Sequence, residues 1–137
     1  MIDNFCVADP NIADFPIEPE DWYLDKPASP NFSNSEINAT HQVMIRRAVA
    51  RGVNFAGKYV VTEWGCGTSC QRFAVINAKT GKIIATDLES SHGAEYQKNS
   101  FLLVVNPQSS WSSLKTLGLQ KTKYYLVKDD ELKPYCE

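Results

Sequence analysis

The sequence predicts a single α+β domain, in which one N-terminal helix packs on an antiparallel meander of five to six strands. An extended, proline-rich N-terminal arm precedes the helix. Five of the seven prolines fall within residues 1–34, apolar residues then recur at helical spacing, and the hydrophobic period changes to two after Gly52. With 137 residues, of which 43% are hydrophobic, the chain is long enough to bury one core without a metal.

The arm is expected over residues 1–34. Proline removes a backbone donor and disfavours helix in the residue before it. The arm also holds five aromatic residues, which favours a segment anchored on the body over a loose linker. It carries seven acids and one lysine, whereas residues 35–137 carry nine acids and thirteen bases. We therefore expect an acidic arm that lies across a mildly basic body.

The helix is expected over residues 35–51. Ser33, Asn34 or Ser35 would cap its start, because short polar side chains accept hydrogen bonds from the first free amides of a helix. Gly52 would end it, since glycine tolerates the left-handed conformation that follows many helices.

Antiparallel strands are expected over residues 58–136. A turn at Asn77–Lys82, with Gly81 at positive φ, and a turn at Asp129–Asp130 would each close a hairpin. Residues 87–99 are expected to form a polar loop. The expected strands cover 58–64, 72–77, 82–86, 100–106, 122–128 and 132–135.

The most distinctive motif is WGCGTSCQ at residues 64–71, which places two of the four cysteines four residues apart between glycines. We favour the pairs Cys66–Cys70 and Cys6–Cys136, because a short loop closes easily and the ends of a domain often lie close together. The alternative is four reduced cysteines in a cytosolic protein.

Several function classes are disfavoured. A net charge of −2 is too weak for a nucleic-acid surface, and no stretch approaches the roughly 18 apolar residues of a membrane span. His41 and His92 are isolated, so neither a metal site nor another cofactor is expected, and no catalytic residue is assigned. The sequence shows no leader, and paired cysteines favour a periplasmic or secreted protein whose signal peptide is absent from this sequence.

Two loops are candidate contact surfaces for a protein partner. One is the cysteine motif at residues 64–71, and the other is the polar loop that holds His92–Tyr96. For the cysteine motif, the alternative is that Trp64 only caps the core while its polar neighbours face water. The candidate binding residues are Trp64, Thr68, Ser69, Gln71, His92, Glu95 and Tyr96.

The segments Asn54–Tyr59, Trp64–Gln71 and Thr80–Lys82 read N-F-A-G-x-Y, W-G-C-G-x-x-C-Q and T-G-K. In this order they resemble a family of small, mostly exported bacterial proteins of unassigned function, over residues 52–128. Asn77 stands where that family commonly has an aspartate. The resemblance implies export and an oxidised Cys66–Cys70 pair, and it implies no reaction.

The segment His92–Tyr96 is also similar to the S-G-x-x-Y loop with which periplasmic lysozyme inhibitors plug a carboxylate cleft, with histidine in place of serine. We therefore expect an exported binding protein that recognises another protein, in its sharper form an inhibitor of a cell-wall enzyme or toxin. The competing hypothesis is a thiol-dependent enzyme with Cys66 or Cys70 as nucleophile and His41 or His92 as base. The oligomeric state is not predicted.

Overall fold

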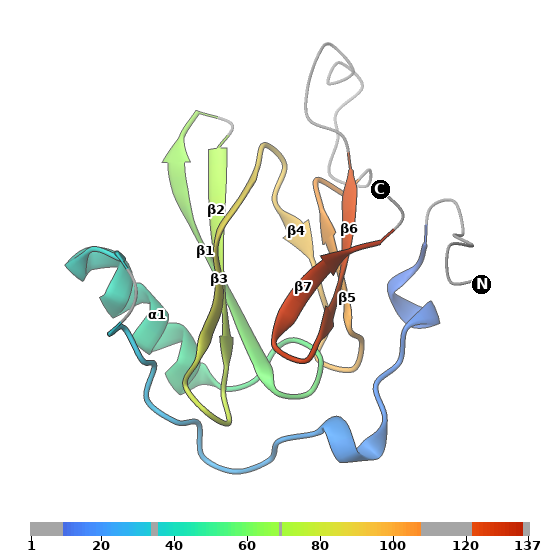
Figure 1. Ribbon diagram of the computed structural model, residues 1–137. Helices are drawn as coiled ribbons and strands as arrows, with labels where there is room; N and C mark the ends of the chain where they lie inside the picture. Colours follow the sequence, from blue (N-terminus) through green and yellow to red (C-terminus); the bar gives the residue numbers. More distant parts are fainter. Residues whose placement is uncertain (1–9, 34–35, 69, 108–121, 136–137) are drawn as a thin grey trace.

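The structure is a computed structural model that describes residues 10–33, 36–68, 70–107 and 122–135 (Figure 1). Within these residues the regular elements are two short 3-10 helices, one α-helix and seven strands. Their bounds are η2 Ile12–Asp14, η3 Pro19–Asp21, α1 Ala39–Arg51, β1 Tyr59–Gly67, β2 Cys70–Asn77, β3 Ile83–Ser90, β4 Ala94–Glu95, β5 Leu102–Val105, β6 Lys123–Lys128 and β7 Glu131–Pro134.

The described strands form two antiparallel sheets, with the orders β1-β2-β3 and β4-β5-β6-β7. Figure 1 shows α1 on the outer face of the first sheet and the second sheet on its other side. The predicted α+β domain with a single meander is therefore wrong, because the fold is mostly β and is split into two sheets. Strands that follow one another do pair, except at the step from β3 to β4, where the chain passes to the second sheet.

The split follows from the apolar residues on both faces of β1 and β2. Tyr59 and Val61 point into a core shared with β5 and β6, whereas Val60 and Trp64 point into a second core under α1. Because successive side chains of a strand alternate between faces, two neighbouring apolar faces need two covering layers. The second sheet covers one face, and α1 covers the other.

The helix begins later than expected. Asn38 is its N-cap and accepts a hydrogen bond from the backbone amide of His41 at 2.8 Å, so the helix starts at Ala39 and the expected start at residue 35 is wrong. Of the expected caps, Ser33 lies outside the helix, and residues 34 and 35 lie outside the described residues. Gly52 ends the helix at φ +101°, as predicted.

The predicted long extended arm is also corrected. Residues 10–33 contain η2 and η3, and they run along the lower edge of both sheets (Figure 1). The Tyr23 amide donates to the Gly57 carbonyl at 2.8 Å, and the Ala28 amide donates to the Ala78 carbonyl at 2.7 Å. This segment is thus bonded into the body along its length. Residues 1–9, with Cys6, and residues 136–137, with Cys136, lie outside the described residues.

Local turn signals are confirmed. Gly81 has φ +81°, and a side chain there would collide with the carbonyl oxygen of Ser29. Asp129 and Asp130 have φ of 51° and 62°, which is the pattern of the two-residue type I′ hairpin turn. In the described part of the chain, no helix is long and apolar enough to cross a membrane.

Candidate functional site

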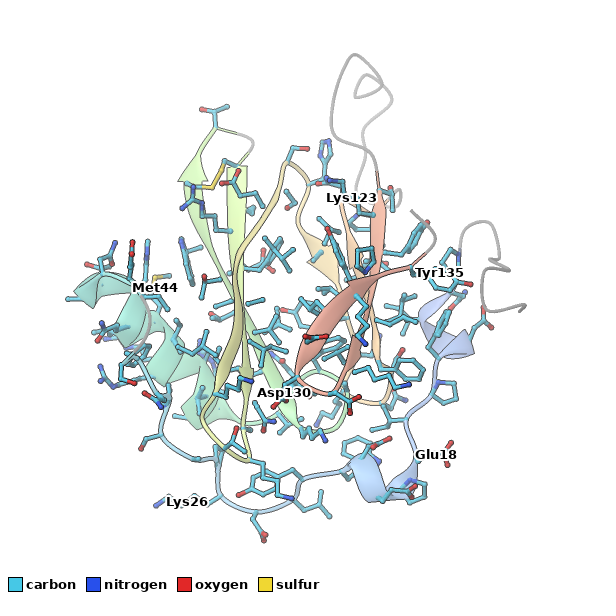
Figure 2. The ribbon with its side chains drawn as sticks, viewed as in Figure 1. Glu18, Lys26, Met44, Lys123, Asp130 and Tyr135 are labelled. Carbon is cyan, nitrogen blue, oxygen red and sulfur yellow. A yellow bond between two sulfur atoms is a disulfide. The ribbon has the colours of Figure 1, made fainter. Side chains whose placement is uncertain are left out.

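The β1–β2 hairpin ends in a turn closed by the predicted Cys66–Cys70 disulfide, which is confirmed with a Cα–Cα distance of 5.1 Å. We call residues 65–70 the stapled tip. Gly65, Cys66, Gly67 and Thr68 are exposed, and the tip projects past the neighbouring strand (Figure 1). Figure 2 shows the disulfide as the yellow bond across the two strands. Ser69 lies outside the described residues.

Trp64 anchors the base of the stapled tip. Its exposed fraction is 8%, and its ring stacks on that of His41 from α1, with centroids 4.3 Å apart. Beside it, Arg72 and Glu89 form an ion pair of 2.8 Å across β2 and β3. The structure thus places Trp64 in the helix-side core, and the exposed contact surface lies beyond it.

On the opposite face of the first sheet, the strand register brings Glu63 and Gln71 together. Glu63 pairs with Phe73, and Gln71 pairs with Gly65. Because Phe73 belongs to the core between the sheets, Glu63 and Gln71 also face the second sheet. Glu63 is partly buried and forms no ion pair or side-chain hydrogen bond within the described chain. Burial raises the pKa of its carboxyl above the ordinary value.

Tyr96 faces Glu63 from the second sheet. It packs on the core between the sheets, and its ring lies 6.3 Å from that of Phe55. Burial, and then the charge of Glu63, raises the pKa of its hydroxyl, so the two side chains interact electrostatically. We call Glu63, Gln71 and Tyr96 the open end of the space between the sheets.

The loop between β3 and β4 borders the open end and is fixed by Asn106. The Asn106 side-chain oxygen accepts from the amides of Ser91 at 2.9 Å and His92 at 2.8 Å. The loop starts at Ser90, which pairs with Gln71. Of the predicted contact residues, Thr68, Gln71 and His92 therefore lie at one end of the first sheet, and Tyr96 packs beside Phe55.

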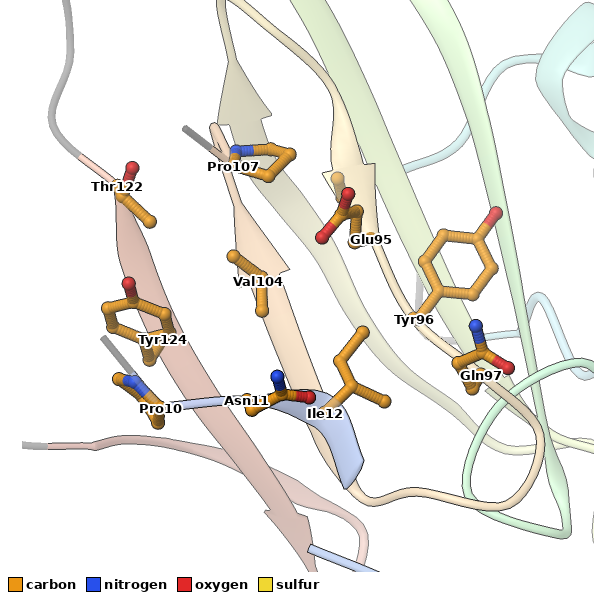
Figure 3. A pocket seen from close by; sticks show the side chains of 11 residues that line it. Pro10, Asn11, Ile12, Glu95, Tyr96, Gln97, Val104, Pro107, Thr122 and Tyr124 are labelled. Carbon is orange, nitrogen blue, oxygen red and sulfur yellow. The ribbon is translucent and has the colours of Figure 1, made fainter. Parts of the chain in front are cut away.

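Glu95 lies apart from Thr68, Gln71 and His92 and shares a cavity with its neighbour Tyr96. It lines this cavity, of about 700 Å³, on the outer face of the second sheet, where Glu95, Val104 and Tyr124 form a row across three strands (Figure 3). It is the one charged side chain among the described residues that line this cavity. The predicted contact residues therefore do not form a single surface.

At the other end of the space between the sheets, a tyrosine, an asparagine and an aspartate are joined by hydrogen bonds. The Tyr59 hydroxyl and the Asn77 side-chain amide both donate to the Asp130 carboxylate at 2.8 Å. We call these three residues the closed end, and Figure 2 labels Asp130 there.

At the closed end the two ionisable groups have opposite pKa shifts. Burial, followed by the hydrogen bond and the charge of Asp130, raises the pKa of Tyr59. Burial alone would raise the pKa of Asp130. The hydrogen bonds from Asn77 and Tyr59 and the charges of Lys82 and Lys58 lower it below its ordinary value.

Glu63 is not among the residues predicted from the sequence, although its position along β1 is a signal. Along β1, Tyr59, Val61 and Glu63 lie at every second position, so a carboxylate follows two core residues on one face of the strand. A charge at a core-facing position is uncommon and marks either a partner or a functional group.

No group of His, Cys, Asp and Glu side chains in the described part of the chain is suited to holding a metal ion. Comparison with protein-family models, curated proteins and solved structures finds no match to this chain. Its function is therefore inferred from its own residues.

Proposed function

We propose that the protein is an exported binding domain that recognises another protein through the stapled tip and the neighbouring Ser90–Gly93 loop. The observation that carries this proposal is the exposed tip, which is closed by a disulfide and rests on the buried Trp64. A surface held in one conformation before binding loses less conformational entropy when a partner docks. Rigid loops on a sheet commonly carry recognition.

The disulfide also supports the proposed location. Disulfides persist in oxidising compartments and are rare in the reducing cytosol. A periplasmic or secreted location agrees with this chemistry and with the family resemblance of the WGCGTSCQ motif. In its sharper form, the proposed activity is inhibition of a cell-wall enzyme or toxin by a small, rigid protein.

The thiol-dependent enzyme is disfavoured by the same bond, because the nucleophile of such an enzyme is a thiolate and both sulfur atoms are engaged. A thiol titration of the folded Cys6→Ser/Cys136→Ser variant isolates this pair. We expect no reactive thiol until a reductant is added. A reactive thiol that Cys70→Ser removes would overturn the binding proposal in favour of the enzyme.

The binding proposal is tested by capture from an envelope extract, followed by titration of the purified captured protein. Thr68→Arg changes an exposed residue of the stapled tip, and Ala50→Arg makes the same change on the exposed face of α1 as a matched control. We expect Thr68→Arg to weaken binding at least about tenfold, as for disruption near the centre of an interface, and Ala50→Arg to leave it unchanged. Equal affinity of wild type and Thr68→Arg would show that the stapled tip is not the contact surface.

A further inference from the structure

We propose that a cavity beside the closed end is a binding site for a small amphipathic carboxylate, that is, a molecule with an apolar body and one carboxylate group. The cavity has a volume of about 510 Å³ and lies between residues 17–21, the start of β1 and the β6–β7 hairpin. Small-molecule sites in proteins commonly measure roughly 300–1,000 Å³. No described residue of the stapled tip or of the Ser90–Gly93 loop lines this cavity, so the inference does not rest on the proposed function.

The floor of the cavity is apolar. Ile17 and Phe101 are partly buried and pack against the core between the sheets, to which Ala56 and Val127 belong. Leu126 adds a further partly buried side chain from β6. A ligand with a hydrocarbon chain or ring would cover this surface, and the burial of apolar area would supply part of the binding free energy.

The wall opposite the hairpin is held in place by backbone contacts. The Tyr23 amide donates to the Gly57 carbonyl at 2.8 Å, and the Ile17 amide donates to the Asn99 carbonyl at 3.2 Å. A Cβ atom added to Gly57 would lie 2.5 Å from Ile17 Cδ1 and 2.8 Å from the Asp21 carbonyl oxygen. The wall is therefore packed tightly against the turn before β1, and the cavity is formed before a ligand binds, which lowers the entropic cost of binding.

Three lysines surround the apolar floor. Lys58 comes from the turn before β1 and is partly buried, whereas Lys128 and Lys133 come from the β6–β7 hairpin and are exposed. Lys133 lies directly opposite Leu126 in the strand register, and Lys128 lies two residues from Leu126 along β6. Both hairpin lysines thus share one face of the hairpin with a residue of the floor.

Two of these lysines have no carboxylate at ion-pair distance. Within the described residues, Lys58 and Lys128 form no ion pair, and Lys133 has a single long contact of 3.8 Å with the exposed Glu131. The Lys58 ammonium lies 5.9 Å from the centroid of the Tyr59 ring, which also lines the cavity. The cavity therefore combines an apolar floor with ammonium groups that can receive an anion.

Two aspartates restrict that anion to a single charge. Asp21 and Asp129 also line the cavity, so three ammonium groups are opposed by two carboxylates and one positive charge remains. The Asp21 carboxylate accepts from the Glu18 amide at 2.9 Å, which directs one of its oxygens to its own segment. A monocarboxylate balances the remaining charge, whereas a phosphate group of up to two charges would be repelled by the aspartates.

The test is an NMR titration of the purified protein with phenylbutanoate. Phenylbutanamide serves as the neutral isostere, and acetate serves as the carboxylate without an apolar body. We expect a dissociation constant of about 1 mM for phenylbutanoate, as is typical of a ligand of about twelve non-hydrogen atoms. Shift changes should be largest at the backbone amides of Lys58, Phe101 and Val127. Phenylbutanamide and acetate should each bind at least about tenfold more weakly, because one lacks the charge and the other lacks the apolar contact.

Lysine variants locate the site. Lys128→Gln should weaken phenylbutanoate binding about threefold, as for loss of one exposed charge, and Lys58→Gln/Lys128→Gln should weaken it to the level of the amide. Lys123→Gln is the matched control, because Lys123 is an exposed lysine at the other end of β6 and does not line the cavity. This variant should bind like wild type.

Equal affinity for phenylbutanoate and phenylbutanamide, or for phenylbutanoate and acetate, would overturn the proposal. So would tighter binding of inorganic phosphate, or wild-type affinity in a Lys58→Gln/Lys128→Gln variant that is folded by its amide spectrum. If the double variant does not fold, wild-type affinity in Lys128→Gln overturns the proposal in the same way. Thr68→Arg should bind phenylbutanoate normally even if it abolishes capture, so failure of this proposal and failure of the proposed function give different results.

Discussion

Each end of the space between the sheets holds a carboxylate, a phenol and an amide, but within the described residues the carboxylate accepts hydrogen bonds only at the closed end. At the closed end, Tyr59 and Asp130 are joined by a hydrogen bond of 2.8 Å, and Asn77 completes the set. At the open end, Tyr96 and Glu63 interact electrostatically, and neither has a hydrogen-bond partner among the described side chains. The closed end ties the sheets together, whereas the Glu63 carboxylate at the open end forms no ion pair or hydrogen bond within the described residues.

The carboxyl pKa values record this difference. At the closed end, hydrogen bonds and nearby lysines outweigh burial and lower the pKa of Asp130. At the open end, burial acts alone and raises the pKa of Glu63. The same chemical group, a carboxylate, is therefore a structural element at one end and without a partner among the described residues at the other.

The largest change in stability is expected from removing the Asp130 carboxylate, which accepts the hydrogen bonds of the closed end. Asp130→Ala should lower the free energy of unfolding by about 2–3 kcal/mol, because the Tyr59 hydroxyl and the Asn77 amide lose a charged acceptor. Asp129→Ala is the matched control, since both residues have positive φ and alanine carries a similar backbone cost at each. Urea unfolding at pH 7 measures both. Equal losses would show that the closed end contributes nothing beyond its turn.

The effect of Asp130 should also depend on pH. A carboxyl whose pKa is lowered by folding stabilises the folded state above its ordinary value, here 3.8, and loses that contribution as the pH falls through the folded value. Unfolding curves of wild type and Asp130→Ala at decreasing pH should therefore converge below pH 3.8. Curves that stay equally separated would contradict the pairing.

Removing the Cys66–Cys70 disulfide should have the second largest effect on the free energy of unfolding. The chain-entropy model gives about 2 kcal/mol for so short a loop, and Cys66→Ser/Cys70→Ser should lose up to that amount. The local effect should be clearer, because the tip is exposed and lies outside both cores. Amide hydrogen exchange of Gly67 and Thr68 should accelerate more than that of Val75 in the core. Unchanged exchange at Thr68 would mean that the disulfide does not order the tip.

Tyr59 and Tyr96 allow the same substitution to be compared at a hydroxyl that donates a hydrogen bond and at one that donates none within the described residues. Tyr59→Phe removes a hydroxyl that donates to Asp130, so it should lower the free energy of unfolding by about 1 kcal/mol. Tyr96→Phe removes a hydroxyl without a hydrogen-bond partner among the described groups, so it should change that energy by less than about 0.5 kcal/mol. Thermal unfolding of both variants at pH 7 is sufficient. A larger loss for Tyr96→Phe would reverse the assignment of the two ends.

The smallest effect, and the one with the opposite sign, is expected at Glu63. Glu63→Gln should raise the free energy of unfolding at pH 7 by less than about 1 kcal/mol, since solvent still screens part of the charge. Because folding raises this carboxyl pKa, the wild-type chain gains stability as the pH falls through the folded value. The advantage of glutamine should be gone below the ordinary value of 4.5. Glu89→Gln, which breaks an exposed ion pair, should give no gain. A loss of stability in Glu63→Gln at pH 7 would indicate a paired carboxylate.

Local features of the fold could be predicted from the sequence, because a few adjacent residues determine them. Gly81 and the Asp129–Asp130 pair mark their turns by backbone preference, and the spacing of Cys66 and Cys70 marks the disulfide. The start of the helix could not be predicted, since several neighbouring polar residues have similar capping preferences. Only the structure shows that the Asn38 side chain accepts the bond from His41.

The arrangement of strands depends on contacts between residues that are distant in the chain. The hairpins β1–β2, β2–β3 and β6–β7 were visible, but residues 87–99 were wrongly expected to be a loop, since they hold the end of β3 and all of β4. The division into two sheets required weighing both apolar faces of β1 and β2 together. The candidate site was predicted in part for the same reason. Thr68 and His92 were visible as loop residues, whereas Glu63 gained meaning only when the register placed it on the core-facing side of β1, opposite Phe73.

The central claim, that the two ends differ because one carboxylate is paired and the other is not, is tested most directly by NMR titration of the side-chain carboxyl carbons of Glu63 and Asp130. We expect a Glu63 pKa above its ordinary 4.5 and an Asp130 pKa below its ordinary 3.8 in the same folded sample. A Glu63 pKa at or below 4.5 would mean that the carboxylate already has a partner, and it would contradict the account.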